Sequence, residues 1–193
     1  MPVESDLKSL ITRALGAAEA ERALTFEVSD LTVLRTTAEQ LMRMTPPDSG
    51  NCVLMSAAWA LHLRDRYNLP AVAITGDLKA GNHWGFRASN DLPEPKQTGS
   101  MIPLGWRGHC WVEVAGLICD ISIFRTVYRQ PLNSDTRKFF ERHFGTDRGA
   151  FIGRPDEMPD GLQYRRRAVL TASQMVGFFE GFRVAIEGRQ QRG

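Results

Sequence analysis

Residues 108–120 read GHCWVEVAGLICD, two mostly apolar runs on either side of the pair Ala115-Gly116. Short apolar runs that flank two small residues are typical of a β-hairpin, so we expect strands over 109–114 and 117–124. The stretch also holds two of the three cysteines, one of the four histidines and an aspartate. These residue types could belong to a zinc site, a disulfide or a catalytic site.

The length of the turn decides which of these side chains lie together. If residues 115–116 form a two-residue turn, Val114 pairs with Leu117 and Asp120 becomes the diagonal neighbour of His109 on the same face. An imidazole and a carboxylate can bridge the roughly 7 to 8 Å between such backbone positions. A three-residue turn would move Asp120 to the opposite face unless a bulge restored it.

Strand alternation argues against a zinc site and against a disulfide in this hairpin. His109 and Cys110 are adjacent and point to opposite faces, so they cannot both bind one ion without distortion. No C-x-x-C or H-x-x-x-H spacing occurs in the chain. Cys110 and Cys119 share the other face, but they are diagonal, near the limit of roughly 7 Å between Cα atoms for a disulfide. We expect no metal and no other cofactor, and we interpret both cysteines as core packing.

The third cysteine lies upstream, in DSGNCVLMSAAWALHLRDRY over 48–67. A polar turn precedes Cys52, and the residues after it are apolar on nearly every side, which predicts a buried helix that starts near Cys52. Unpaired backbone N–H groups and the helix dipole stabilise a thiolate at such a position. Cys52 is therefore a candidate nucleophile. The alternative is a small core residue at the end of a helix.

A thiol nucleophile needs a base and a group that orients the base, and His109 and Asp120 could supply both. The stretches GNCVLMSAAWALHLRDRYNLPAVAITGDL (50–78) and GHCWVEVAGLICDIS (108–122) resemble the transglutaminase-like branch of the papain-like cysteine enzymes. Members carry a cysteine at a helix start, a histidine in an H-x-W-V-E-V strand and an aspartate in the next strand. Cys52, His109 and Asp120 match these positions in chain order. The resemblance covers about 48–124 and is to a superfamily rather than to one enzyme.

The oxyanion donors are left open by the sequence. No glutamine like the one that papain uses stands upstream of Cys52. The candidates for oxyanion or substrate contacts are the Cys52 N–H and the side chains of Asn51, Asn82, His83, Trp84 and Trp106.

The remaining elements are read from spacing and turn residues. Upstream, we expect helices over 5–22, capped by Ser5, and over 30–44, then a strand over 71–75 that ends at residues 76–77. Residues 77–108 read as a long loop that could hold a strand at 83–87. Downstream, we expect a helix over 134–143, a loop over 145–163, a solvated edge strand over 165–171 that carries Arg165–Arg167, and a final helix. That helix is expected to open with a capping box, Thr171 to Gln174, and to carry on one side Met175, Phe178, Phe179 and Phe182.

This order of helices, then mostly strands, then a helix favours an α+β fold with an antiparallel sheet. With 193 residues, the chain is expected to form a single domain. It would comprise a helical part (1–47), a catalytic core (48–124) and a C-terminal loop, strand and helix (125–193). The resemblance implies that the core is papain-like, with the Cys52 helix packed on the sheet.

The composition bears on the kinds of partner and on the cell compartment that we expect. A formal net charge of +2 gives no reason to expect nucleic acid, and no apolar run is long enough to predict a membrane span. The polar N-terminus does not look like a signal peptide, and an odd number of cysteines suggests a reducing compartment, so we expect the cytoplasm. The oligomeric state is left open.

The resemblance implies a thiol-dependent hydrolase that cleaves a peptide, isopeptide or amide bond through Cys52, His109 and Asp120. Nothing in the sequence indicates a site for a second acyl acceptor, so water is favoured over an amine. Three alternatives stay open: an acyltransferase with an amine acceptor, a catalytically inactive binding or scaffold protein of the same fold, and a metal-binding module.

Overall fold

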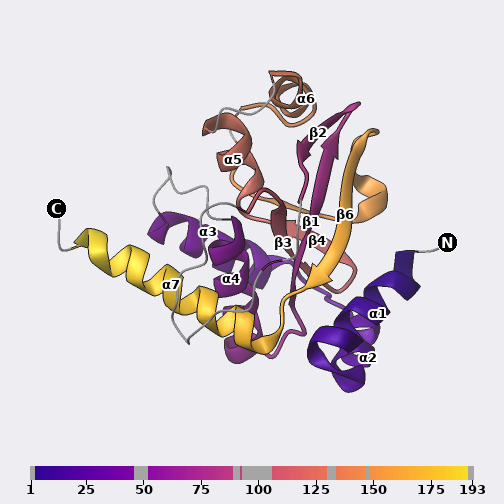
Figure 1. The fold of residues 1–193 in the computed structure, drawn as a ribbon, viewed down its shortest axis with the longest axis vertical. Helices are drawn as coiled ribbons and strands as arrows, with labels where there is room; N and C mark the ends of the chain where they lie inside the picture. Colours follow the sequence, from indigo (N-terminus) through magenta and orange to yellow (C-terminus); the bar gives the residue numbers. More distant parts are fainter. Residues whose placement is uncertain are drawn as a thin grey trace.

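The computed structural model describes residues 3–45, 52–88, 92, 106–129, 134–146 and 148–190. Within these ranges the chain forms seven α-helices and six strands, and all strand pairings are antiparallel (Figure 1). The helices are α1 (Val3–Leu15), α2 (Ala17–Thr25), α3 (Thr32–Met44), α4 (Cys52–Tyr67), α5 (Ile123–Arg129), α6 (Ser134–Phe144) and α7 (Ala172–Gln190). The strands are β1 (Val72–Ala80), β2 (His83–Phe86), β3 (His109–Val114), β4 (Leu117–Asp120), β5 (Phe151–Gly153) and β6 (Leu162–Val169). The predicted α+β class is confirmed.

Strand β1 is the centre of the sheet because it pairs with three other strands. The strand order is β2-β1-β3-β4-β5, and β6 also pairs with β1. On one edge, residues 72–76 pair with β3 and residues 78–80 pair with β2, while β6 follows the other edge along residues 74–80. The start of β3, the end of β2 and the middle of β6 therefore meet around Gly76.

Helices cover both faces of the sheet. On one face α4 packs against β1 and β3, and α7 covers α4 from outside (Figure 1). On the other face α1 and α2 pack over Ile74 and Trp111. Among the described residues, no helix has the length and apolar character needed to cross a bilayer.

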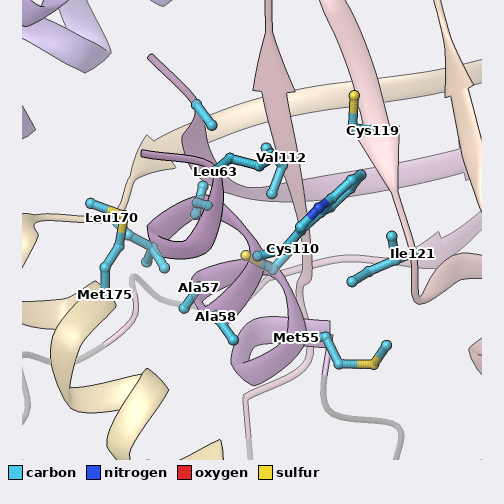
Figure 2. Packing of buried hydrophobic residues seen from close by; sticks show 14 of the residues in the cluster. Met55, Ala57, Ala58, Leu63, Cys110, Val112, Cys119, Ile121, Leu170 and Met175 are labelled. Atoms are coloured by element: carbon cyan, nitrogen blue, oxygen red, sulfur yellow. The ribbon is translucent and has the colours of Figure 1, made fainter. Parts of the chain in front are cut away.

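Helix α4 is buried around most of its circumference, which confirms the prediction for this segment. Small residues allow its neighbours to approach closely. Figure 2 shows Ala57 and Ala58 with Cys110 of β3 on one side and Leu170 and Met175, near the start of α7, on the other. Residues 52–61 lie between the sheet and another helix and are therefore almost all apolar, whereas polar residues stand toward the C-terminal end of α4, at 62 and 64–66.

The β3–β4 hairpin closes through the predicted two-residue turn. Residues 115–116, an alanine and a glycine, have φ angles of 53° and 71°, the left-handed values that a tight hairpin turn requires. Val114 pairs with Leu117, as predicted. Cys110 and Cys119 both lie in the cluster on the α4 side of the sheet, which confirms their interpretation as core residues.

Strand β4 ends at Asp120, so the strand predicted to continue to residue 124 is too long. The Asp120 carboxylate accepts hydrogen bonds from the N–H groups of Ser122 and Ile123, both at 3.0 Å, and so caps α5. The sequence analysis missed α5, because the β-branched and aromatic residues of this segment are also typical of a strand.

Strand β1 continues through Gly76 and Asp77, where a turn was predicted. A Cβ atom at Gly76 would lie 2.0 Å from the Arg165 carbonyl oxygen and 2.7 Å from the Trp111 ring. Asp77 is buried and pairs with Arg167 at 2.8 Å. The two residues that resemble a turn signal are therefore sites of close packing and ion pairing inside a strand, beside a bulge in the β1–β6 ladder.

The predicted N-terminal helix over 5–22 is two helices. Gly16 separates α1 from α2 and has a φ angle of 96°, which no α-helix contains. Because α1 begins at Val3, Ser5 lies within the helix and does not cap it. Helix α3 confirms the predicted helix over 30–44 to within two residues at its start.

In the C-terminal half, the observed elements agree more closely with those predicted from the sequence. Helix α6 confirms the predicted helix, while β5 and a short 3₁₀ helix, Pro155–Glu157, lie in the segment predicted as loop. Thr171 and Gln174 form the predicted capping box through reciprocal hydrogen bonds of 3.0 and 3.1 Å. On α7, Phe178 is buried, but Phe179 is 38% exposed, so it does not share the buried side as predicted.

Candidate active site

The site is built on a buried pair in the β3–β4 hairpin. His109 is the first residue of β3 and Asp120 is the last residue of β4. The two-residue turn places them diagonally on one face of the sheet, and the Nε2 atom of His109 lies 2.5 Å from Oδ2 of Asp120. Both side chains are fully buried. The diagonal contact expected from the sequence is therefore present.

Asp120 is held by five hydrogen bonds. Its Oδ1 accepts from the N–H and the hydroxyl of Ser122 and from the N–H of Ile123, each at 3.0 Å. Its Oδ2 accepts from His109 and from the Tyr164 hydroxyl, the latter at 3.0 Å. Burial alone would raise the pKa of Asp120, but the charge of His109 and these hydrogen bonds outweigh burial and lower it. Asp120 is therefore a fixed carboxylate.

Three aromatic rings surround the imidazole of His109. Phe86 stacks on it with a centroid distance of 4.9 Å and an angle of 23° between the rings. The rings of Trp111 and Tyr164 each lie 6.2 Å away. This packing fixes the plane of the imidazole and keeps water from its faces.

The second nitrogen of the imidazole has no hydrogen bond of good geometry to any described residue. Among the described residues, Nδ1 of His109 is one of two buried side-chain polar atoms without a hydrogen bond. Buried polar atoms are nearly always paired, so an orphan atom calls for a functional explanation. Because Nε2 is held by Asp120, Nδ1 is the nitrogen that can exchange a proton with another group.

Cys52 is the group next to His109 that can exchange that proton. It is the first residue of α4 and is 8% exposed. The Ser56 hydroxyl, one turn later, donates to the Cys110 carbonyl oxygen at 3.0 Å and ties the start of α4 to β3 beside His109. The Cys52 N–H belongs to the first turn of α4, whose N–H groups have no partner within the helix. The Cys52 side chain is close enough to His109 to raise the pKa of the imidazole, so Cys52, His109 and Asp120 are neighbours.

The charge balance favours a protonated imidazole. Burial alone would lower the pKa of His109, but the charge and hydrogen bond of Asp120 and the proximity of the Cys52 side chain raise it to about 10. The thiol acts on this pKa, although Nδ1 has no hydrogen bond of good geometry. Catalytic hydrogen bonds are often long before substrate binds.

A second buried pair is formed by Glu113, which lies four residues after His109 on the same face of β3. Glu113 accepts from Nε and Nη2 of Arg166 at 2.7 and 2.9 Å, and it also accepts from the Trp111 indole N–H at 2.9 Å. The side chains of Glu113 and Arg166 are 5% and 11% exposed. The interpretation of Arg165–Arg167 as solvated is therefore wrong for Arg166, and Arg167 pairs with Asp77.

Cys110 and Cys119 differ from Cys52 in being completely buried. All three cysteines are free thiols, and burial raises the pKa of both Cys110 and Cys119. Within the part of the chain that the structure describes, no three side chains of His, Cys, Asp or Glu gather as metal ligands.

The other candidate residues from the sequence have different positions. Asn51 lies outside the described residues. Asn82 and His83 are exposed at the β1–β2 turn, four residues along β1 from the residue that pairs with His109, a distance of about 13 Å. His83 pairs there with Asp135 of α6 at 3.4 Å. Asn82 and His83 are therefore not brought to Cys52.

The two tryptophans differ from each other. The ring of Trp84 contacts two guanidinium groups, those of Arg87 and Arg165, at 5.5 and 4.7 Å from the ring centroid. Trp106 packs against the cluster that contains Cys52, and a Cβ atom on Gly108 would lie 2.2 Å from its ring. Of the two, Trp106 is the one that the structure places beside the start of β3.

Comparisons with protein-family models, with curated proteins and with solved structures find no match. The resemblance to transglutaminase-like enzymes therefore stays a prediction from the sequence.

Sequence reasoning missed two residues of the site. Tyr164 lies in a basic strand, and it reaches Asp120 only because a bulge in β6, opposite Thr75 and Gly76 of β1, sets its register opposite Leu78. Phe86 reaches His109 because β2 shares an edge of β1 with β3. Neither contact leaves a local sequence signal, since each depends on long-range strand pairing.

Proposed function

We propose that this protein is a thiol-dependent hydrolase that cleaves a peptide, isopeptide or other amide bond, with a papain-like, transglutaminase-like core. The observation that carries the proposal is the state of His109. One of its nitrogens is fixed by Asp120, the other has no hydrogen bond to any residue that the structure describes, and the Cys52 side chain acts on the same ring. This is the arrangement that a nucleophile, base and orienting carboxylate require.

In the first half-reaction, the Cys52 sulfur attacks the carbonyl carbon of the substrate, and the thiol proton resides on Nδ1 of His109. The tetrahedral oxyanion is stabilised by the Cys52 N–H and its neighbours in the first turn of α4. When the C–N bond breaks, Nδ1 donates the proton to the leaving amine. The product of this step is a thioester on Cys52.

In the second half-reaction, Nδ1 of His109 removes a proton from water, and the oxygen attacks the thioester carbonyl. The C–S bond breaks, a carboxylic acid leaves, and the proton returns to the Cys52 sulfur. Asp120 accepts from Nε2–H throughout, so it fixes the tautomer that presents Nδ1 to the sulfur. An amine in place of water would give acyl transfer by the same steps.

The proposal is tested with a panel of acyl-donor electrophiles, such as activated esters and peptide amides with reporter leaving groups, on the wild type and on Cys52→Ala. We expect mass spectrometry to find a transient acyl adduct on Cys52 and steady release of the leaving group, both lost in Cys52→Ala. Cys119→Ala is the matched control and should keep turnover. Equal turnover in the wild type and Cys52→Ala would refute the proposal.

One observation favours a second function. Cys52 is only 8% exposed and His109 is not exposed at all, as expected for a protein that keeps the fold as a binding or scaffold module without turnover. The electrophile panel separates the two functions. A binding protein would give neither the adduct nor turnover with any donor in the panel.

A further inference from the structure

A second site candidate lies outside the Cys52 region, between the end of α3 and helix α5. A cavity of about 650 Å³ opens there, and four arginines line it. They are Arg43 of α3, Arg125 and Arg129 of α5, and Arg148. Cavities of roughly 300 to 1,000 Å³ are the usual size for small-molecule sites.

The lining carries an excess of positive charge. Glu39 is the one acidic residue among the described residues that line the cavity, and it pairs with Arg43 at 3.3 Å on an exposed part of α3. Arg125 and Arg148 bond only to backbone carbonyl oxygens within the described ranges: Arg125 to Met42 and Thr45, and Arg148 to Phe144. Within the described part of the chain, neither of these guanidinium groups pairs with a carboxylate.

Counted over the described residues, these two arginines also have N–H donors that make no hydrogen bond. A guanidinium has five N–H groups, and the bonds to carbonyl oxygens use two in Arg125 and one in Arg148. Partial burial and the positive charge of Arg129 lower the pKa of Arg125, so an anion bound beside Arg125 would favour its charged form. Paired donors of this kind suit the oxygens of phosphate or carboxylate groups.

We propose that this cavity binds a small organic oxyanion, whose phosphate or carboxylate oxygens bond to Arg125 and Arg148 while its apolar part packs against Met42 and Tyr128. Cys52, His109 and Asp120 do not line the cavity. The proposal therefore goes beyond the hydrolase function and does not depend on it. The two sites are nevertheless joined by α5, whose start is capped by Asp120.

The test is isothermal titration calorimetry of the full chain at pH 7 and constant ionic strength, with inorganic pyrophosphate and citrate as separate probes and chloride as the reference salt. We expect saturable 1:1 binding of at least one probe with a Kd below about 1 mM. Pyrophosphate alone would indicate a phosphate-bearing ligand, and citrate alone a carboxylate. Binding of both would indicate a general oxyanion site.

Three variants make the test specific. Arg148→Gln should raise the Kd about tenfold or more, because it removes charge-assisted hydrogen bonds. Arg125→Gln should do the same. If loss of its contacts with the end of α3 unfolds the chain, Arg148→Gln alone decides the matter. Arg183→Gln, on the exposed side of α7, is the control and should leave the Kd unchanged. The proposal is overturned if neither probe binds saturably, or if Arg148→Gln binds as tightly as the wild type.

Discussion

Two buried acid–base pairs lie on the same face of β3, and they are built differently. In the pair of Glu113 and Arg166, both carboxylate oxygens are bound by the guanidinium, and the Trp111 indole adds a third donor. In the pair of His109 and Asp120, the carboxylate is as well satisfied, but one nitrogen of the base, beside a thiol, makes no hydrogen bond within the described ranges. Burial and charge are alike in the two pairs, and only the second retains an atom that can react.

The comparison shows how to separate a structural ion pair from a candidate catalytic one. A pair whose partners are fully satisfied links two strands, here β3 and β6, and has no reason to exchange protons. A pair with an orphan nitrogen next to a nucleophile incurs a cost in stability that function can explain. Variants of the first pair should therefore change stability, and variants of the second should change the reactivity of Cys52.

The largest effect is expected for Glu113→Gln. This change leaves the buried Arg166 guanidinium without its counter-charge, which costs about 3 to 5 kcal/mol of the free energy of unfolding. Urea unfolding would measure the loss. The double variant Glu113→Leu with Arg166→Met should recover much of it, because both charges are then removed together. A Glu113→Gln protein of wild-type stability but slow Cys52 alkylation would reverse the assignment of the two pairs.

The second largest effect is expected for His109→Asn. It is measured as the rate of Cys52 alkylation in the folded protein at pH 7. Loss of the base that holds the thiol proton should slow the reaction roughly 100-fold. His143→Asn, on an exposed part of α6, is the control and should react like the wild type. An unchanged rate in His109→Asn would show that the ring does not activate the thiol.

The pair of His109 and Asp120 should also make stability depend on pH. The pKa of His109 is about 10 in the folded protein, above the unfolded value of 6.5, so the folded state holds the proton longer. Its stabilising contribution is complete below pH 6.5 and is lost as the pH rises through 10. One proton sets a limit of about 1.4 kcal/mol per pH unit on the decline. Unfolding of the wild type and His109→Asn between pH 7 and 9 should show this slope in the wild type only; equal slopes would contradict the raised pKa.

The smallest effect is expected for Tyr164→Phe, which removes one of the five hydrogen bonds to Asp120. A hydrogen bond to a charged group contributes about 1.5 kcal/mol to stability, so unfolding should shift by that amount. Alkylation of Cys52 should slow only a few-fold, since His109 keeps its bond to Asp120. If Tyr164→Phe slowed alkylation as much as His109→Asn, Tyr164 would have a role in the chemistry beyond holding the carboxylate.

Local patterns predicted much of the fold. The buried helix after Cys52, the two-residue turn at 115–116 and the capping box at Thr171 all follow from neighbouring residues, and all are present. The predictions that failed concern residues whose local structure depends on segments far away in the sequence. Gly76 looks like the end of a strand until β6 and Trp111 pack against it, and Asp120 ends β4 because its side chain caps the next helix.

The same distinction between local and long-range contacts applies to the candidate site. The contact of His109 with Asp120 was predictable because both residues lie on one hairpin, whose register its turn determines. Phe86 and Tyr164 were not predictable, because they reach the site through the pairing of β1 with β2 and β6. The orphan nitrogen could not be foreseen either, since it follows from the packing around the whole ring.

The most direct test of the account is the rate at which iodoacetamide alkylates each cysteine of the folded protein at pH 7, resolved by peptide mass spectrometry, in the wild type and in Asp120→Asn. The account predicts that Cys52 reacts at least roughly tenfold faster than Cys110 and Cys119, and that Asp120→Asn removes most of this advantage without changing the exposure of the sulfur. The account is contradicted if Cys52 reacts no faster than the other two cysteines, or if its rate is the same in Asp120→Asn.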